Sequence, residues 1–139
     1  MTQKPKHSNP DRRSRHAAMA EFRFELRRFA HFSEVAAREL GLTPQQHQAL
    51  LSIHGTPERA QTIGELANRL MIKPHSATGL ASRLIANGLI ERQAVEDRRV
   101  VQLRLTRAGE KLLSALSRVH EAELRRIKPL LHGLIDRIG

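Results

Sequence analysis

Hydrophobic residues recur at helical spacing over the first third of the chain. Between residues 16 and 40 the apolar stripe includes Phe22, Leu26 and Phe29, while the opposite face is rich in arginine. This period of three to four residues is typical of an amphipathic helix. Gly41 follows as a stop signal. The pattern therefore predicts one long helix with a single buried face.

Three shorter helices are expected next, each with a start signal. Thr43 to Gln46 has the form of a capping box with Pro at the first helical position, and this helix ends near Gly55. Thr62 to Glu65 is a second capping box, which opens a short helix over 63–71. Pro74 opens the third helix, over 74–87. Two short helices joined by a tight turn indicate a helix-turn-helix.

A β-hairpin and a final helix complete the pattern. Residues 89–92 start a strand, residues 93–99 form a charged turn, and apolar and polar side chains alternate over 101–105. This alternation predicts a hairpin with one buried face. Thr106 is expected to cap a last helix, and Pro129 to bend or break it.

The expected fold is therefore mainly α-helical with a small β-hairpin wing. We expect a basic flexible tail at 1–15, a dimerisation helix at 16–42, a winged helix-turn-helix lobe at 43–106 and a second dimerisation helix at 107–139. The tail either touches DNA backbone or is only solvated. Dimerisation is expected because the terminal helices carry more apolar surface than one small subunit can hide. The residues concerned are Phe22, Leu26, Phe29, Leu124, Ile127, Leu131 and Ile138.

Charge and composition narrow the class of partner. The chain has 24 Lys and Arg against 14 Asp and Glu, so its formal net charge of +10 favours a polyanionic partner. Only 3% of residues are aromatic, which argues against a stacking platform for single strands. The absence of cysteine excludes disulfides and thiol redox sensing. Without a signal peptide or a long apolar run, a cytoplasmic location is expected.

One face of the 74–87 helix is suited to a DNA groove. His75, Gly79, Ser82, Arg83 and Ala86 share this face, and Ser76 and Thr78 flank it. Small residues allow close approach to a major groove, and hydroxyls, imidazole and guanidinium can meet base edges and phosphates. Arg83 is the candidate base reader, because arginine to guanine is the commonest specific contact. The alternative is an ordinary solvated face.

The tip of the predicted hairpin carries Asp97, Arg98 and Arg99. Arginine on a projecting ribbon suits a narrow minor groove, where the negative potential attracts guanidinium. Asp97 would orient an arginine through a bidentate pair, since a carboxylate contacts DNA unfavourably. The alternative is a solvated charged turn.

These pieces together resemble the MarR family of regulators. The matching segments are IGELANRL, SATGLASRLIANGLIER, the EDRR wing tip and LRLTRAGEKL, in this order within residues 62–113. The resemblance implies a homodimer whose winged lobes bind a pseudo-palindrome in duplex DNA. It places the wing residues Asp97, Arg98 and Arg99 at the minor groove. It places His75, Ser76, Thr78, Gly79, Ser82 and Arg83 at the major groove.

The resemblance also implies an effector pocket. Many MarR-family proteins bind a small anionic, often aromatic ligand between the dimerisation helices and the DNA-binding lobe. Here the pocket would be lined by Arg23, Arg27, His31, His47 and His54, although each is equally compatible with a surface or core role. No short His, Asp or Glu spacing indicates a metal site, and no cofactor is expected.

We expect a transcriptional regulator that binds double-stranded DNA sequence-specifically and acts as a repressor. In one version of this hypothesis, a small anionic ligand releases it from DNA. An enzyme is not expected, because no phosphate loop, paired carboxylates or nucleophile motif occurs. Two alternatives stay open: a sequence-neutral architectural DNA-binding protein, and a winged-helix protein–protein adaptor. Specific over non-specific DNA affinity, together with the salt dependence of binding, separates the three.

Overall fold

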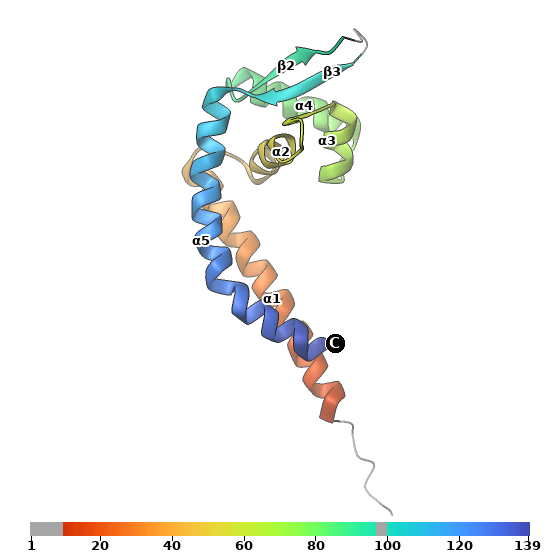
Figure 1. Ribbon diagram of the computed structural model, residues 1–139, viewed down its shortest axis with the longest axis vertical. Coiled ribbons are helices and arrows are strands. Elements are labelled where there is room, and N and C mark those ends of the chain that lie inside the picture. The colour runs from red at the N-terminus through yellow and green to blue at the C-terminus, as the bar shows by residue number, and fades with distance from the viewer. Residues whose placement is uncertain (1–9, 97–99) are drawn as a thin grey trace, which may run out of the picture. The chain divides into compact units, whose positions relative to one another are not determined.

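The computed structural model describes residues 10–96 and 100–139. The described residues form two compact units, one over 34–119 and the other comprising the described part of 1–33 together with 120–139. The mainly helical fold with a small antiparallel sheet confirms the predicted class (Figure 1). The elements in chain order are α1 (Pro10–Glu39), α2 (Pro44–His54), β1 (Ala60–Gln61), α3 (Ile63–Leu70), α4 (Pro74–Ala86), β2 (Ile90–Ala94), β3 (Val101–Leu105) and α5 (Arg107–Ile138).

The first helix is longer than the pattern predicted, whereas the last one has the predicted bounds. Helix α1 begins at Pro10 instead of near residue 16, so the expected flexible tail is helical from that point. Proline suits the first helical position because it has no N–H to leave unsatisfied, and the arginines after it are good helix formers. Helix α5 continues through Pro129 without a break. None of the helices in the described part of the chain is long and apolar enough to cross a membrane.

Side-chain caps fix where three helices start. Thr43 accepts from the Gln46 N–H at 3.2 Å, and Gln46 accepts from the Thr43 N–H at 3.0 Å, so this capping box is complete. The second predicted box is only half formed. Thr62 accepts from the Glu65 N–H, but the Glu65 carboxylate accepts from the Thr62 hydroxyl instead of from its backbone. Thr106 caps α5 by accepting from the Gly109 N–H at 3.2 Å.

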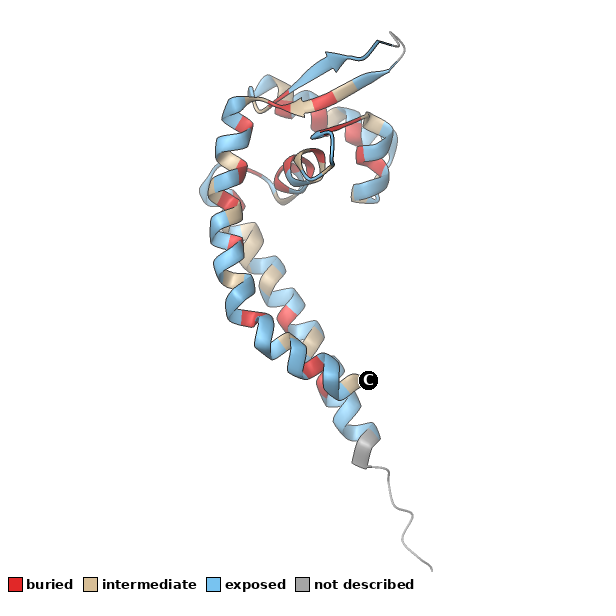
Figure 2. Ribbon diagram, in the orientation of Figure 1, coloured by how far each residue is buried: buried red, intermediate tan, exposed pale blue. Residues whose placement is uncertain are grey.

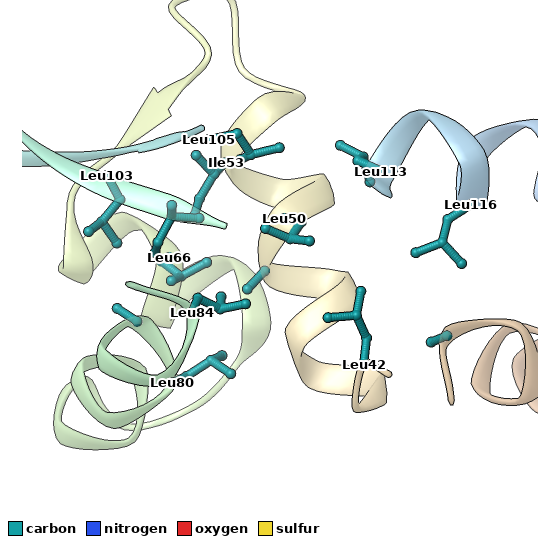
Figure 3. Packing of buried hydrophobic residues seen from close by; sticks show 14 residues of the cluster. Leu42, Leu50, Ile53, Leu66, Leu80, Leu84, Leu103, Leu105, Leu113 and Leu116 are labelled. Atoms are coloured by element: carbon teal, nitrogen blue, oxygen red, sulfur yellow. The ribbon is translucent and has the colours of Figure 1, made fainter. Parts of the chain in front are cut away.

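The unit over 34–119 has a continuous apolar core (Figure 3). Leu50, Leu66 and Leu84 bring α2, α3 and α4 together and are fully buried. Each such side chain contributes about 1.5–3 kcal/mol by leaving water. Ala37 of α1 and Leu116 of α5 join the same core. This unit therefore extends beyond the predicted 43–106 lobe at both ends.

The sheet covers this core with its order β1-β3-β2. Strands β2 and β3 are antiparallel, with Ile90 opposite Leu105 and Ala94 opposite Val101. Leu103 and Leu105 are buried, but Val101 is 44% exposed, so the buried face of the hairpin is shorter than predicted. Strand β1 was not predicted, because two residues are too few to show an alternating pattern.

In the other unit, α1 and α5 pack through a histidine held between two aromatic rings. The His120 ring meets Phe29 and Phe32 edge-on, at centroid distances of 5.8 and 5.7 Å, and its Nε2 lies 2.7 Å from the Ser33 hydroxyl. Further along α5, Arg126 donates hydrogen bonds to Glu123 and thereby lowers the pKa of that carboxyl group.

Candidate nucleic-acid interface

Helices α3 and α4 form a helix-turn-helix with a three-residue connection. Met71 ends α3 in the left-handed conformation, at φ 56° and ψ 43°. Its N–H and that of Ile72 still bond to carbonyls of α3, so the backbone reverses without losing hydrogen bonds. Lys73 precedes α4, and Pro74 occupies its first turn. The turn therefore places the start of α4 firmly against α3.

The two faces of α4 have opposite character (Figure 2). Ala77, Leu80, Ala81 and Leu84 are buried, as predicted for the inner face. The outer face is polar. Thr78 turns its hydroxyl back onto the Pro74 carbonyl at 3.1 Å. The predicted major-groove residues His75, Ser76, Thr78, Ser82 and Arg83 are all exposed, and Gly79 is half-buried.

This outer face permits close approach and is electrostatically suited to phosphate. A Cβ added at Gly79 would meet nothing within 4 Å, so no neighbouring atoms cover the helix surface there. Helix α4 contains no Asp or Glu. The ion pairs found among residues 10–96 and 100–139 all lie on α1 or α5, so none neutralises Arg83. The face can thus offer hydrogen-bond donors and positive charge to a polyanion.

Strands β2 and β3 extend beside the helix pair as the wing. Arg104 of β3 fixes the base of the wing. Its Nε donates to Gln93 at 2.9 Å, and its Nη2 donates to the Glu58 carbonyl at 3.1 Å. It thereby ties β3 to β2 and to the loop before β1. The predicted minor-groove residues Asp97, Arg98 and Arg99 lie outside the described residues.

The residues predicted to bind an effector lie on two helices. Arg23, Arg27 and His31 are exposed on α1, while His47 is buried and His54 half-buried on α2. The two sets belong to different compact units. The effector pocket therefore stays a prediction. No group of three metal-ligating side chains occurs in the part of the chain that the structure describes.

The residues predicted for dimerisation differ in exposure. Leu26 and Leu124 are 47% and 45% exposed. Phe22, Phe29, Leu131 and Ile138 are half-buried, and Ile127 is buried within the subunit itself. Other apolar residues of these helices are also exposed, and the helical period alone did not distinguish them from buried positions. They include Met19, Phe24, Leu130 and Ile135.

Several solved structures similar to this chain are described as transcriptional regulators. Tm0710 from Thermotoga maritima is 30% identical, with coverage of 81% of each chain and a TM-score of 0.61. AbsC from Streptomyces coelicolor, a MarR family regulator, is 23% identical, covering 78% of this chain and 76% of that one, with a TM-score of 0.65. A mutant of MepR from S. aureus, bound to an oligodeoxyribonucleotide, is 19% identical, covering 87% and 97%, with a TM-score of 0.69. No curated protein matches the chain.

The helix pair, the exposed polar face of α4 and the strands beside it define a winged helix-turn-helix protein. A model described as MarR family matches residues 40–99, which run from the end of α1 to the wing tip. The chain belongs to the MarR family of transcriptional regulators. Membership of this family supports regulation through DNA binding.

Proposed function

We propose that this protein is a repressor that binds a pseudo-palindromic sequence in double-stranded DNA as a homodimer, and that it has no catalytic activity. The observation that carries the proposal is the outer face of α4, which is exposed, small and polar and includes one arginine. Its dimensions and chemistry suit the floor of a major groove.

In this proposal α4 reads base edges. Ser76 and Ser82 are short donors and acceptors beside the open surface at Gly79, so the helix axis can approach the bases closely. His75 and Thr78 lie in the first turns, where recognition helices contact bases and phosphates. Arg83 reaches farthest and would pair with guanine O6 and N7.

The wing would supply the second contact. Asp97, Arg98 and Arg99 follow β2 in sequence, and the hydrogen bond from Arg104 to Gln93 ties that strand to β3. An arginine at the tip would enter the adjacent minor groove, and Asp97 would orient it. A structural relative, the MepR mutant bound to an oligodeoxyribonucleotide, supports DNA binding by a protein of this fold.

The terminal helices would provide the dimer interface. Leu26 and Leu124 are nearly half exposed, and Phe24, Leu130 and Ile135 add to this apolar surface. A second subunit would remove it from water, as obligate interfaces do. Two-fold symmetry would then present two α4 helices to two half-sites about one helical turn apart.

A small anionic or aromatic effector would release the repressor. The residues proposed for its pocket are Arg23, Arg27, His31, His47 and His54. Arg23 and Arg27 are exposed and one helical turn apart, which suits a carboxylate. Binding of such a ligand would shift the population of dimers away from the DNA-binding arrangement.

The test is selection of bound sequences from a random duplex pool at near-physiological salt. We expect enrichment of an inverted repeat with half-site centres about 10 base pairs apart. Salt-sensitive binding without enrichment would replace this function by sequence-neutral architectural binding. No binding at any salt concentration would favour a protein–protein adaptor. Reporter expression from the selected operator, with and without the protein, then tests repression.

A further inference from the structure

One face of α1 carries an acidic, an aromatic and a basic side chain in turn. Glu21, Phe24 and Arg28 are spaced three and four residues apart, so they lie on the same face of the helix. Glu21 is exposed, Phe24 is 47% exposed, and the side chain of Arg28 is 53% exposed. None of the three belongs to the effector pocket proposed above, so this face has no assigned ligand.

Two neighbours fix the position of Arg28 on this face. Its Nη1 donates to Oε1 of the buried Glu25 at 3.3 Å, and its guanidinium carbon lies 5.9 Å from the centre of the Phe24 ring. No other hydrogen bond of Arg28 is found within the described part of the chain, although a guanidinium has five N–H donors. Donors beside Phe24 are therefore available to an acceptor from outside the subunit.

The acidic residue of this face is not used within the subunit. Glu21 takes part in none of the ion pairs found among residues 10–96 and 100–139. Arg28 of the same helix is too far away to pair with it, because seven residues of α-helix span about 10 Å. Glu21 and Arg28 are, however, equally distant from the midpoint between Phe24 and Glu25. Two α1 helices packed antiparallel about that midpoint would place each Glu21 beside the partner subunit's Arg28.

We propose that a second copy of this chain packs on this face, with the two-fold axis of the dimer passing beside Phe24. Phe24 would contact the partner subunit's Phe24 and leave water. Two reciprocal ion pairs, each between Glu21 of one copy and Arg28 of the other, would flank the aromatic contact. An isologous interface needs such a self-complementary patch, because symmetry repeats every contact. The face carries both signs of charge, so it fits a second copy better than a partner of one charge.

The charges would decide the direction in which the two helices pack. Exposed ion pairs are individually weak, so the apolar contact would supply most of the affinity. Parallel helices packed on the same face would bring Glu21 beside the partner subunit's Glu21 and Arg28 beside the partner subunit's Arg28. Like charges disfavour that arrangement, and the antiparallel one is selected. This inference rests on the homodimer of the proposed function and adds the position of its symmetry axis.

Cysteine cross-linking of the full-length chain tests the position of the axis, because a residue beside a two-fold axis meets its own copy. The chain has no cysteine, so Phe24→Cys introduces a single thiol. We expect oxidised glutathione to convert this variant into a disulfide-linked dimer, seen on a non-reducing gel. Leu26→Cys is the matched control, since Leu26 is also 47% exposed but lies about 200° away around α1. It should cross-link about tenfold or more slowly, because a disulfide requires Cα atoms within about 7 Å of each other.

Glu21→Lys tests the ion pairs, by sedimentation equilibrium in the absence of DNA. It should weaken self-association about tenfold or more, because each new cation would face the partner subunit's Arg28. Adding Arg28→Glu to the same chain should restore the affinity of the parent. Glu39→Lys, at an exposed glutamate near the end of α1, is the control and should associate like the parent. The cross-linking result decides the proposal if the doubly substituted chain does not fold, since Arg28→Glu also faces Glu25.

Three results would overturn the proposal. Leu26→Cys could cross-link in place of Phe24→Cys, or Glu21→Lys could associate like the parent. A parent that dimerises without a Phe24→Cys cross-link would exclude this axis and leave the homodimer standing. A parent that stays monomeric at every concentration would exclude the homodimer as well. DNA binding is tested separately by the duplex selection, so failure there would leave the cross-linking result unchanged.

Discussion

At the scale of residues, Arg83 should contribute most to the ability of α4 to distinguish one base pair from another. It is the only lysine or arginine within α4, and the residues around it are short. Because Ser82 and Gly79 are small, α4 can approach DNA closely. The long Arg83 side chain can then reach past the phosphates to the bases. Short hydroxyl side chains tolerate several base pairs, whereas a bidentate arginine strongly prefers guanine. Most of the sequence preference should therefore depend on this one side chain.

Arg83→Ala should relax base preference at one position of each half-site by about 1–3 kcal/mol. The physical reason is loss of the bidentate pair, which no neighbour on α4 can replace. The measurement is competition binding with a set of operators mutated at single positions. Arg38→Ala, at an exposed arginine of α1, is the control and should keep the preference of the parent. If Arg83→Ala discriminates between these operators as the parent does, α4 does not read bases through Arg83.

At the scale of elements, the start of α5 packs tightly against the segment that ends the helix-turn-helix. The Thr106 N–H donates to the Leu89 carbonyl at 3.0 Å, and the Thr106 hydroxyl donates to the Gly88 carbonyl at 2.6 Å. A Cβ at Gly109 would lie 2.1 Å from the same Leu89 oxygen. Glycine is required here by lack of space between two backbones, not by an unusual conformation.

Gly109→Ala should destabilise the protein by about 1–3 kcal/mol or more, because two backbone segments would have to separate. Gly79→Ala is the matched control, since it also adds a methyl group to a helical glycine but meets open space. It should stabilise the fold by about 0.5–1 kcal/mol through helix propensity. Urea unfolding of the full-length variants measures both. Equal effects of the same sign would contradict the packing described for Gly109.

The sequence predicted those elements that depend on interactions between residues close together in the chain. The starts of α2 and α4 were predictable because Thr43 and Pro74 act within one helical turn. The start of α1 was misplaced although Pro10 is the same kind of signal as Pro74, because the prolines and basic residues before residue 16 were interpreted as a flexible tail. Strand β1 exists only through its pairing with β3, a contact between residues more than 40 positions apart. The sequence pattern around Ala60 and Gln61 alone does not predict such a pairing.

The same difference holds for the candidate sites. The exposed face of α4 follows from the helical period alone, so its residues were predicted from the sequence. A cavity beside α3 combines Ser52, Gln61 and Arg69, which come from three elements and share no spacing rule. Only the folded chain brings these three side chains to the lining of one cavity.

At the scale of the whole molecule, the terminal helices present apolar side chains that one subunit leaves in water. Leu124 and Ile135 of α5 are 45% and 51% exposed, and Phe24 and Leu26 of α1 are each 47% exposed. Exposed apolar clusters of this kind commonly mark an interface. A dimer would also bind DNA more strongly, because it would carry twice the net charge of +10 of one subunit.

Leu124→Lys should weaken self-association by about tenfold or more, since it would bury an unpaired charge in the proposed interface. Val101→Lys is the control, because Val101 is equally exposed at 44% but lies on the wing. Sedimentation equilibrium over a range of protein concentrations measures both. A Leu124→Lys variant that associates like the parent would place the dimer interface elsewhere.

The close contact between Gly109 and Leu89 also bears on how this chain can change in length. Deleting or inserting one residue in the first turn of α5 would bring a side chain with a Cβ against the Leu89 carbonyl, at a place where 2.1 Å leaves no room. The spacing from Thr106, which bonds to Gly88 and Leu89, to Gly109 should therefore tolerate neither insertion nor deletion.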